Sequence, residues 1–192
     1  MRLVAAVTNG ASVSATAVSA AASAPIAIGT NVVAPAVGTY VSVPDGSTIN
    51  VTVNGASVGA PSGTLAAGSD STLMVYGNAA SSSATLITDD NHLPTAASNY
   101  KLRLINGLTG TAVPLSMDVN FATVASNVQP GAASAYTVLP ATPLTPAQIN
   151  VTSPNSPTAI YSLAASLPGG AVFTLFMLGD ASAPIGKPSR DR

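Results

Sequence analysis

The stretch Val172-Phe173-Thr174-Leu175-Phe176-Met177-Leu178-Gly179-Asp180 predicts a buried β-strand. Its bulky and β-branched residues run on without the periodic polar face that a surface helix shows. The turn signal Pro168-Gly169-Gly170 precedes the stretch, and Gly179-Asp180 ends it. We therefore expect a strand that lies in the core of a β-structure.

The same kind of stretch occurs earlier in the chain, at residues 69–78. A shift of 102 positions places Leu73 on Leu175 and Val75 on Met177. These pairs predict that Leu73 and Val75 lie in one core and that Leu175 and Met177 lie in an equivalent second core. The chain is therefore expected to use one β unit twice.

Further motifs recur in the same order and support this duplication. Ile-Asn-Val-Thr at 49–52 returns letter for letter at 149–152, and both Tyr40 and Tyr136 begin an expected strand that closes on a proline. Short strands separated by Gly- and Pro-containing turns are typical of β-sandwiches. We predict an all-β protein with two tandem immunoglobulin-like antiparallel β-sandwich domains. The predicted boundaries are 1–92 for the first domain, with a linker from about 89, 99–183 for the second domain, and 184–192 for a C-terminal tail.

The two copies differ at their carboxyl ends. The first copy continues into a further strand at 84–88, whereas the second offers only Ile185 between Pro184 and the segment 186–188. This difference predicts an unpaired sheet edge in the second domain. An open edge accepts a strand from another chain, and the apolar segment 3–7 is the expected donor.

Composition excludes several classes of protein. Charged residues make up 7% of the chain, against about 25% in typical soluble domains. The net charge of -1 provides no basic surface for nucleic acid. The sequence has no cysteine, which excludes disulfides and thiol catalysis. No apolar run approaches the roughly 18 residues of a membrane-spanning helix, so we expect no membrane span.

The segment Asp89-Asp90-Asn91-His92 is the one cluster with metal-ligand chemistry. Its oxygens could hold Ca²⁺, but four consecutive residues cannot supply the six or more ligands that this ion takes. Asp89 and Asp90 are therefore only weak metal candidates, and we expect no metal and no cofactor. His92 is the single histidine, and no Gly-x-Ser-x-Gly motif accompanies it. We expect no catalytic residues and no enzyme activity.

Four motifs together resemble a known family. They are Lys-Leu-Arg-Leu-Ile-Asn at 101–106, Tyr136 with the following Leu139-Pro140, Phe-Thr-Leu-Phe-Met-Leu-Gly at 173–179 and the closing Arg-Asp-Arg. They are similar to the bacterial "domain of unknown function 4397" family over nearly the whole chain. Members similar to this chain are secreted or lipid-anchored envelope proteins with tandem immunoglobulin-like sandwiches. The resemblance implies a secreted or cell-surface location and carries over no catalytic residue.

The functional hypothesis is a non-enzymatic structural subunit of the bacterial cell surface or of an extracellular, self-assembling polymer or filament. Sparse charge weakens repulsion between copies and favours self-association into a homo-oligomer or polymer. The side chains expected at the assembly interface are Leu3, Val4, Val7, Phe176 and Leu178. The alternative is an envelope-associated binding module that recognises a glycan, such as a cell-wall glycan, or a protein ligand.

Overall fold

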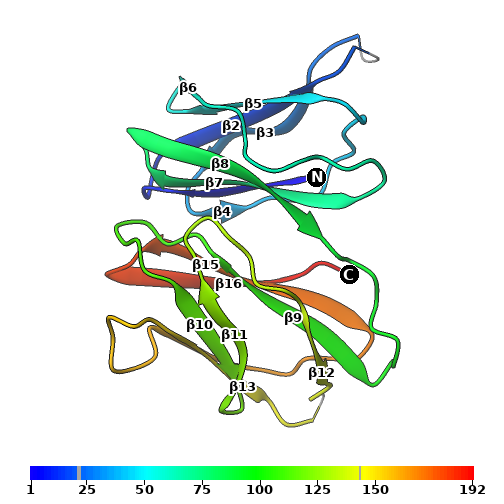
Figure 1. Ribbon diagram of the computed structural model, residues 1–192, viewed down its shortest axis with the longest axis vertical. Helices are drawn as coiled ribbons and strands as arrows, with labels where there is room; N and C mark the ends of the chain where they lie inside the picture. Colours follow the sequence, from blue (N-terminus) through cyan, green and yellow to red (C-terminus); the bar gives the residue numbers. More distant parts are fainter. Residues whose placement is uncertain (21–22, 143) are drawn as a thin grey trace. The chain divides into compact units, whose positions relative to one another are not determined.

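The computed structural model describes residues 1–20, 23–142 and 144–192, and these residues form an all-β protein (Figure 1). Within the described residues, sixteen strands build four sheets of four strands each. None of the described residues lies in a helix, and none of them therefore forms a helix that could cross a membrane. The predicted fold class is confirmed: the sheets form two pairs, as two tandem sandwiches require.

The chain divides into two compact units. The first comprises Met1–Asp90 with the short segments Gly107–Gly110 and Leu178–Ala183, and the second comprises Asn91–Asn106, Thr111–Met177 and Pro184–Arg192. No strand is present between Asp89 and Asn99, the segment in which a linker is expected.

In the first half of the chain, the described residues form eight strands in two sheets of order β4-β1-β7-β8 and β3-β2-β5-β6. The strands are β1 (Arg2–Val7), β2 (Ser12–Val18), β3 (Ile26–Val33), β4 (Ala36–Val37), β5 (Thr48–Val53), β6 (Ala56–Val58), β7 (Asp70–Asn78) and β8 (Ser81–Asp89).

The second half repeats this plan strand for strand, with sheets β12-β9-β15-β16 and β11-β10-β13-β14. The strands are β9 (Asn99–Asn106), β10 (Leu115–Val119), β11 (Ala122–Val128), β12 (Thr137–Pro140), β13 (Ala147–Thr152), β14 (Tyr161–Ala165), β15 (Ala171–Asp180) and β16 (Ala183–Arg190). The duplication read from sequence motifs therefore extends to every strand.

One strand pair in each half is parallel. β1 pairs with β7, with Leu3 opposite Leu73, and β9 pairs with β15, with Leu104 opposite Leu175. Parallel neighbours need a long connection between them, and here the strands of the other sheet supply it. The apolar stretch at 172–180 is thus part of a central strand, paired on both sides.

The core of the first unit lies between its two sheets. Leu3, Leu73 and Val75 of one sheet pack in the same cluster as Val13 and Val51 of the other. Alternate residues of a strand point to one face, which is why Leu73 and Val75 both face the core. Leu73 and Val75 are 0% exposed, Leu175 is 1% and Met177 is 0% exposed, so all four predicted core residues are buried as expected.

The prediction of a tail without a real strand at 184–192 is wrong. β16 spans Ala183–Arg190 and forms the edge of its sheet beside β15. Beyond its end, Asp191 N–H donates to the carbonyl oxygen of Val172 at 2.8 Å, and Val172 N–H donates to that of Arg192 at 2.9 Å. Prolines are compatible with an edge strand because the missing N–H can be the one that would face solvent.

The donor-strand hypothesis is also wrong, because β1 pairs within its own unit. β1 lies between β4 and β7, with Val4 opposite both Val37 and Met74. Leu3, Val4 and Val7 are at most 1% exposed, and Phe176 and Leu178 in β15 are 0% exposed. The five side chains expected at an assembly interface are therefore all buried within the chain.

Candidate functional site

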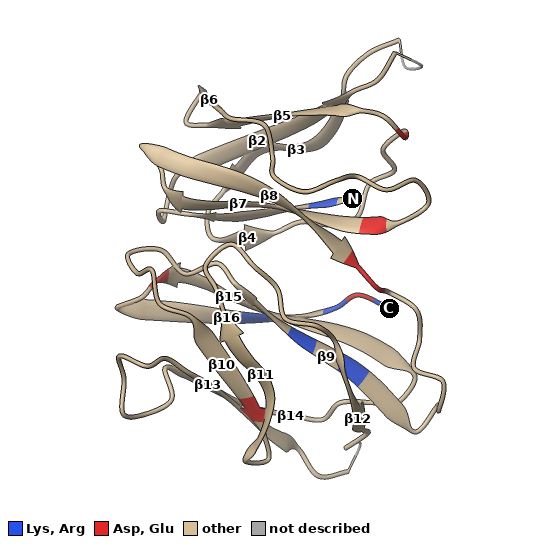
Figure 2. Cartoon of the chain, in the orientation of Figure 1, with Lys and Arg blue, Asp and Glu red and all other residues tan. Residues whose placement is uncertain are grey.

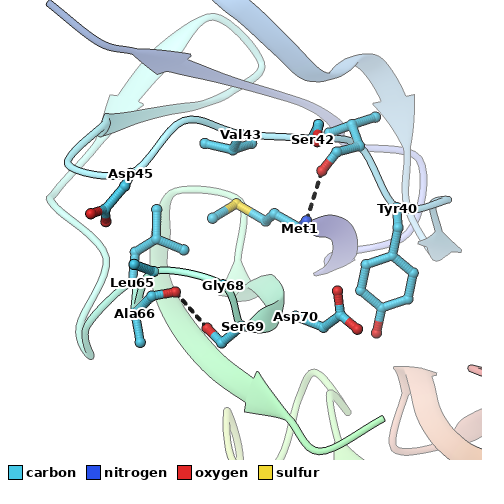
Figure 3. A pocket seen from close by; sticks show the side chains of 12 residues that line it. Met1, Tyr40, Ser42, Val43, Asp45, Leu65, Ala66, Gly68, Ser69 and Asp70 are labelled. Atoms are coloured by element: carbon cyan, nitrogen blue, oxygen red, sulfur yellow. Dashed lines mark hydrogen bonds between the residues drawn. The ribbon is translucent and has the colours of Figure 1, made fainter. Parts of the chain in front are cut away.

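A cavity of about 410 Å³ opens in the first unit (Figure 3). Two segments between strands form most of its wall, one following β4 and one preceding β7. The lining residues are Met1, Tyr40, Val41, Ser42, Val43, Asp45, Leu65, Ala66, Ala67, Gly68, Ser69 and Asp70. Among these residues, Tyr40 recurs in the sequence as Tyr136, and Ser69 and Asp70 begin the stretch that is equivalent to the one at 172–180.

The first wall is held in place by an extension of the β1–β4 pairing. The α-ammonium group of Met1 donates to the carbonyl oxygen of Val41 at 2.7 Å. Val41 N–H donates to the carbonyl oxygen of Met1, also at 2.7 Å, and Gly38 N–H donates to that of Leu3 at 2.8 Å. These backbone bonds fix the segment 38–41 against β1, so that Tyr40 and Val43 border the cavity.

The second wall is a tight turn just before β7. The hydroxyl of Ser69 donates to the carbonyl oxygen of Ala66 at 2.7 Å. Ser69 N–H donates to the same carbonyl at 3.3 Å, and Gly68 between them has a φ of +70°, which glycine adopts without strain. The turn places the side chain of Leu65 on the cavity beside Asp45 (Figure 3).

Two carboxylates and one ammonium group set the charge of the cavity. Asp45 and Asp70 lie on opposite sides of Met1 (Figure 3). Burial lowers the pKa of the Met1 ammonium group, and the carboxylates of Asp70 and Asp89 oppose this effect. Carboxylates, hydroxyls and one aromatic ring are groups that hold a small, hydroxyl-rich molecule by hydrogen bonds.

A buried polar cluster crosses the β4-β1-β7-β8 sheet. Arg2 Nε donates to Thr72 Oγ1 at 2.9 Å, and Thr72 Oγ1 donates to Asp89 Oδ2 at 2.7 Å. The hydroxyl of Tyr40 donates to the same Asp89 oxygen at 2.6 Å, and the Arg2 guanidinium lies 4.8 Å from the centre of the Tyr40 ring. The guanidinium is thus connected to the carboxylate through a threonine hydroxyl, and the ring covers its face.

The second unit contains the same cluster. Arg103 Nε donates to Thr174 Oγ1 at 2.9 Å, and the Thr174 hydroxyl donates to Asp191 Oδ2. Tyr136 OH donates to Asp191 Oδ2 at 3.2 Å. The Arg103 guanidinium lies 4.5 Å from the centre of the Tyr136 ring, and Lys101 Nζ lies 5.0 Å from it. Each cluster therefore joins segments that lie next to the two edge strands of its four-stranded sheet. This role is structural.

Sequence reasoning matched the two tyrosines but missed the charged residues of these clusters. A usable signal was present: charged residues are rare in this chain, yet Arg2 recurs as Arg103 and Asp89 recurs as Asp191 after nearly equal intervals. The strand register then identifies the threonine of each cluster, because Arg2 is the direct neighbour of Thr72, and Arg103 is that of Thr174.

The two metal candidates differ in their surroundings. Asp89 is 4% exposed, and its Oδ2 already accepts two hydrogen bonds, whereas Asp90 is exposed. Nearby, the carbonyl oxygen of His92 accepts a hydrogen bond from Lys101 Nζ at 3.1 Å. Within residues 1–20, 23–142 and 144–192, no group of three or more acidic, histidine or cysteine side chains is placed to hold a metal ion.

Comparison with known proteins adds no further assignment. No protein-family model matches the chain. No curated protein is significantly similar to it.

Proposed function

We propose that this chain is a non-enzymatic structural subunit of the bacterial cell surface, or of an extracellular polymer or filament in which copies contact one another. It would be secreted or held at the cell surface, as the resemblance to the domain of unknown function 4397 family implies. The proposal needs no catalytic residue and no cofactor.

The observation that carries the proposal is the near absence of exposed positive charge. Of the six basic residues, Arg2, Lys101 and Arg103 are at most 7% exposed. The other three, Lys187, Arg190 and Arg192, all lie in the final segment 187–192 (Figure 2). Exposed charge on the rest of the chain is limited to a few aspartates. Such a surface repels other copies weakly and tolerates close packing.

Contacts between such surfaces would depend on backbone hydrogen bonds and apolar area rather than on ion pairs. Salt screens exposed ion pairs strongly, with a Debye length of about 3 Å at 1 M ionic strength. We therefore expect assemblies of this protein to persist when sodium chloride is raised from about 0.05 M to about 1 M. Assemblies that dissociate over this range would be held by charge and would contradict the argument.

Electron microscopy of negatively stained protein, together with light scattering over a range of concentrations, tests the proposal directly. Filaments, or a mass that rises with concentration, support a self-assembling subunit. A monomer at every concentration would contradict it.

The cavity of the first unit favours a second candidate, an envelope-associated module that binds a glycan or a protein ligand. Tyr40, Asp45 and Asp70 give this cavity one aromatic surface and two hydrogen-bond acceptors, a combination that suits a sugar. Retention of the monomer on a cell-wall glycan array, lost on the substitution Asp45→Ala, would support this candidate over the first.

A further inference from the structure

The four sheets have eight edges, and most of them carry a feature that blocks pairing with another chain. Unpaired backbone groups at a sheet edge accept a foreign strand unless the edge is short, bulged, covered, or carries charge or proline. β4, β6 and β12 are short, with two, three and four residues. β12 also ends at Pro140.

The longer edges are protected in other ways. β3 and β11 are irregular in register, and each contains an asparagine with positive φ, Asn31 at 49° and Asn127 at 55°. Such bulges twist an edge away from regular pairing. β8 is covered near its middle by Ser62, whose N–H donates to Ala84 O at 3.0 Å and whose carbonyl accepts from Leu86 N–H at 2.8 Å.

β16 is protected by its sequence. Its eight residues include Pro184, Lys187, Pro188 and Arg190. Prolines remove backbone donors, and two cations at one edge disfavour a second copy of the same edge. Among the described strands, this leaves β14 as the edge without protection.

β14 (Tyr161–Ala165) pairs with β13 on one side through a regular register from Val151 opposite Tyr161 to Ala147 opposite Ala165. It contains no charge, no proline and no residue with positive φ. No described residue pairs with its other side. Its free edge therefore presents the backbone groups that β13 does not use.

The side chains of β14 alternate in the manner of a strand with one wet face. Tyr161, Leu163 and Ala165 are half-buried, whereas Ser162 and Ala164 are exposed. Tyr161 points inward, since a Cβ on Gly186 of β16 would lie 2.2 Å from its ring. An added strand would have to match this alternation.

We propose that the free edge of β14 pairs with β14 of a second copy of this chain, antiparallel and centred on Leu163. The inference rests on the proposed self-association and names its contact. Among the described strands, every other edge of a second copy carries one of these protecting features, so the matching edge is β14 itself. In this register Leu163 faces Leu163 of the second copy, Tyr161 faces Ala165, and Ser162 faces Ala164.

This register is self-complementary. The half-buried residues of both copies fall on one face and the exposed residues on the other, and a large ring is placed opposite a small side chain. No like charges oppose each other. The contact relates two copies by a twofold axis and uses the β14 edge of both. A polymer therefore needs one more contact elsewhere on the chain. Five residues on each side make a small interface, and we expect an association that depends on concentration.

A single cysteine tests the register, because the chain contains none of its own. In Leu163→Cys the two cysteines would lie directly opposite, with Cα atoms about 4.5–5.5 Å apart, within the range that a disulfide spans. We expect a disulfide-linked dimer on mild oxidation. Ala27→Cys is the matched control, since Ala27 is exposed on β3, an edge strand with an irregular register. If L163C cross-links to no greater extent than A27C, the proposal is overturned.

Charge supplies a second, independent test. Ala164→Lys adds a cation to the exposed face of the edge, and we expect it to weaken association about tenfold at low salt. Ala27→Lys should leave association unchanged. The double variant Ser162→Asp/Ala164→Lys should restore association, because each lysine then faces an aspartate of the other copy. If A164K associates as well as the unsubstituted chain, the β14 contact is wrong while the proposed self-association stands. If the unsubstituted chain is itself monomeric, the proposed function fails as well.

Discussion

Tyr40 donates its hydroxyl hydrogen to Oδ2 of Asp89 at 2.6 Å, although 49 positions separate the two residues in the chain. Asp89 is 4% exposed, so its carboxylate depends on such donors for the solvation that it loses on folding. This bond connects the segment after β4 to the end of β8, at opposite ends of one sheet.

Tyr40→Phe removes that donor and keeps the ring. We expect a loss of about 1–3 kcal/mol in the free energy of unfolding, because a buried carboxylate loses one of its partners. Urea denaturation measures the change. The equivalent bond from Tyr136 to Asp191 is longer, at 3.2 Å, so Tyr136→Phe should cost less. Equal losses in both variants would show that the hydroxyl contact does not determine the effect.

The contact between Gly186 and Tyr161 predicts a steric effect. A Cβ at position 186 would lie 2.2 Å from Cζ of Tyr161, so Gly186→Ala has to displace the ring. We expect it to destabilise the protein by about 1–3 kcal/mol.

Gly59→Ala is the matched control, since nothing lies within 4 Å of a Cβ there. The loss caused by Gly186→Ala should shrink in a Tyr161→Ala background, because the two residues share one contact. Thermal unfolding of the four variants gives the comparison. If the losses from Gly186→Ala and Tyr161→Ala are additive, the Tyr161 ring is not the cause of the loss at position 186.

Two hairpin turns of the same geometry differ in one residue. Asn54-Gly55 joins β5 to β6 with φ angles of 50° and 81°, and Asn120-Phe121 joins β10 to β11 with 50° and 68°. Positive φ at both positions suits Asn-Gly, whereas a phenylalanine there is strained by roughly 1–2 kcal/mol.

Phe121 is also 90% exposed, so its replacement removes little packing. Phe121→Gly should stabilise the protein by about 0.5–1 kcal/mol, since the greater freedom of glycine in the unfolded chain offsets part of the strain relieved. Gly55→Phe, the reverse change, should destabilise it. A shift of the urea midpoint in the opposite direction for either variant would contradict this account.

Two tyrosines predict a loss of stability in alkali. Burial raises the pKa of Tyr100 and of Tyr161 above the ordinary value of 10.0. A raised folded-state pKa means that the stabilisation is complete below the unfolded pKa and is lost as pH rises through the folded one. We expect the urea midpoint to fall above about pH 10.

Tyr100→Phe should flatten this decline, because Tyr100 is 1% exposed and its phenylalanine substitute cannot ionise. The measurement is a series of urea denaturation curves from pH 8 to above pH 10, with the unsubstituted chain as reference. An unchanged pH profile in the variant would assign the decline to other groups.

Much of the fold could be predicted from the sequence because local patterns of residues specify the strands. A continuous apolar run such as the one at 172–178, and the Gly- and Pro-containing turns on either side of such runs, define strands over a few residues. Recurrence of Leu73 as Leu175 then identified the duplication and the two cores. These signals need no knowledge of which strand lies beside which.

The features that the sequence analysis missed depend on neighbours far apart in the chain. β16 looked too rich in proline to be a strand, yet pairing with β15 accommodates Pro184 and Pro188 at an edge. β1 looked like a free apolar segment, yet its place between β4 and β7 buries it. The Arg2–Thr72–Asp89 cluster and the open edge of β14 likewise exist only once the strand order is set. Hydrogen bonds between strands join residues by spatial register rather than by sequence distance, so tertiary structure alone decided which of the described strands lie at a sheet edge and which of these edges carry a protecting feature.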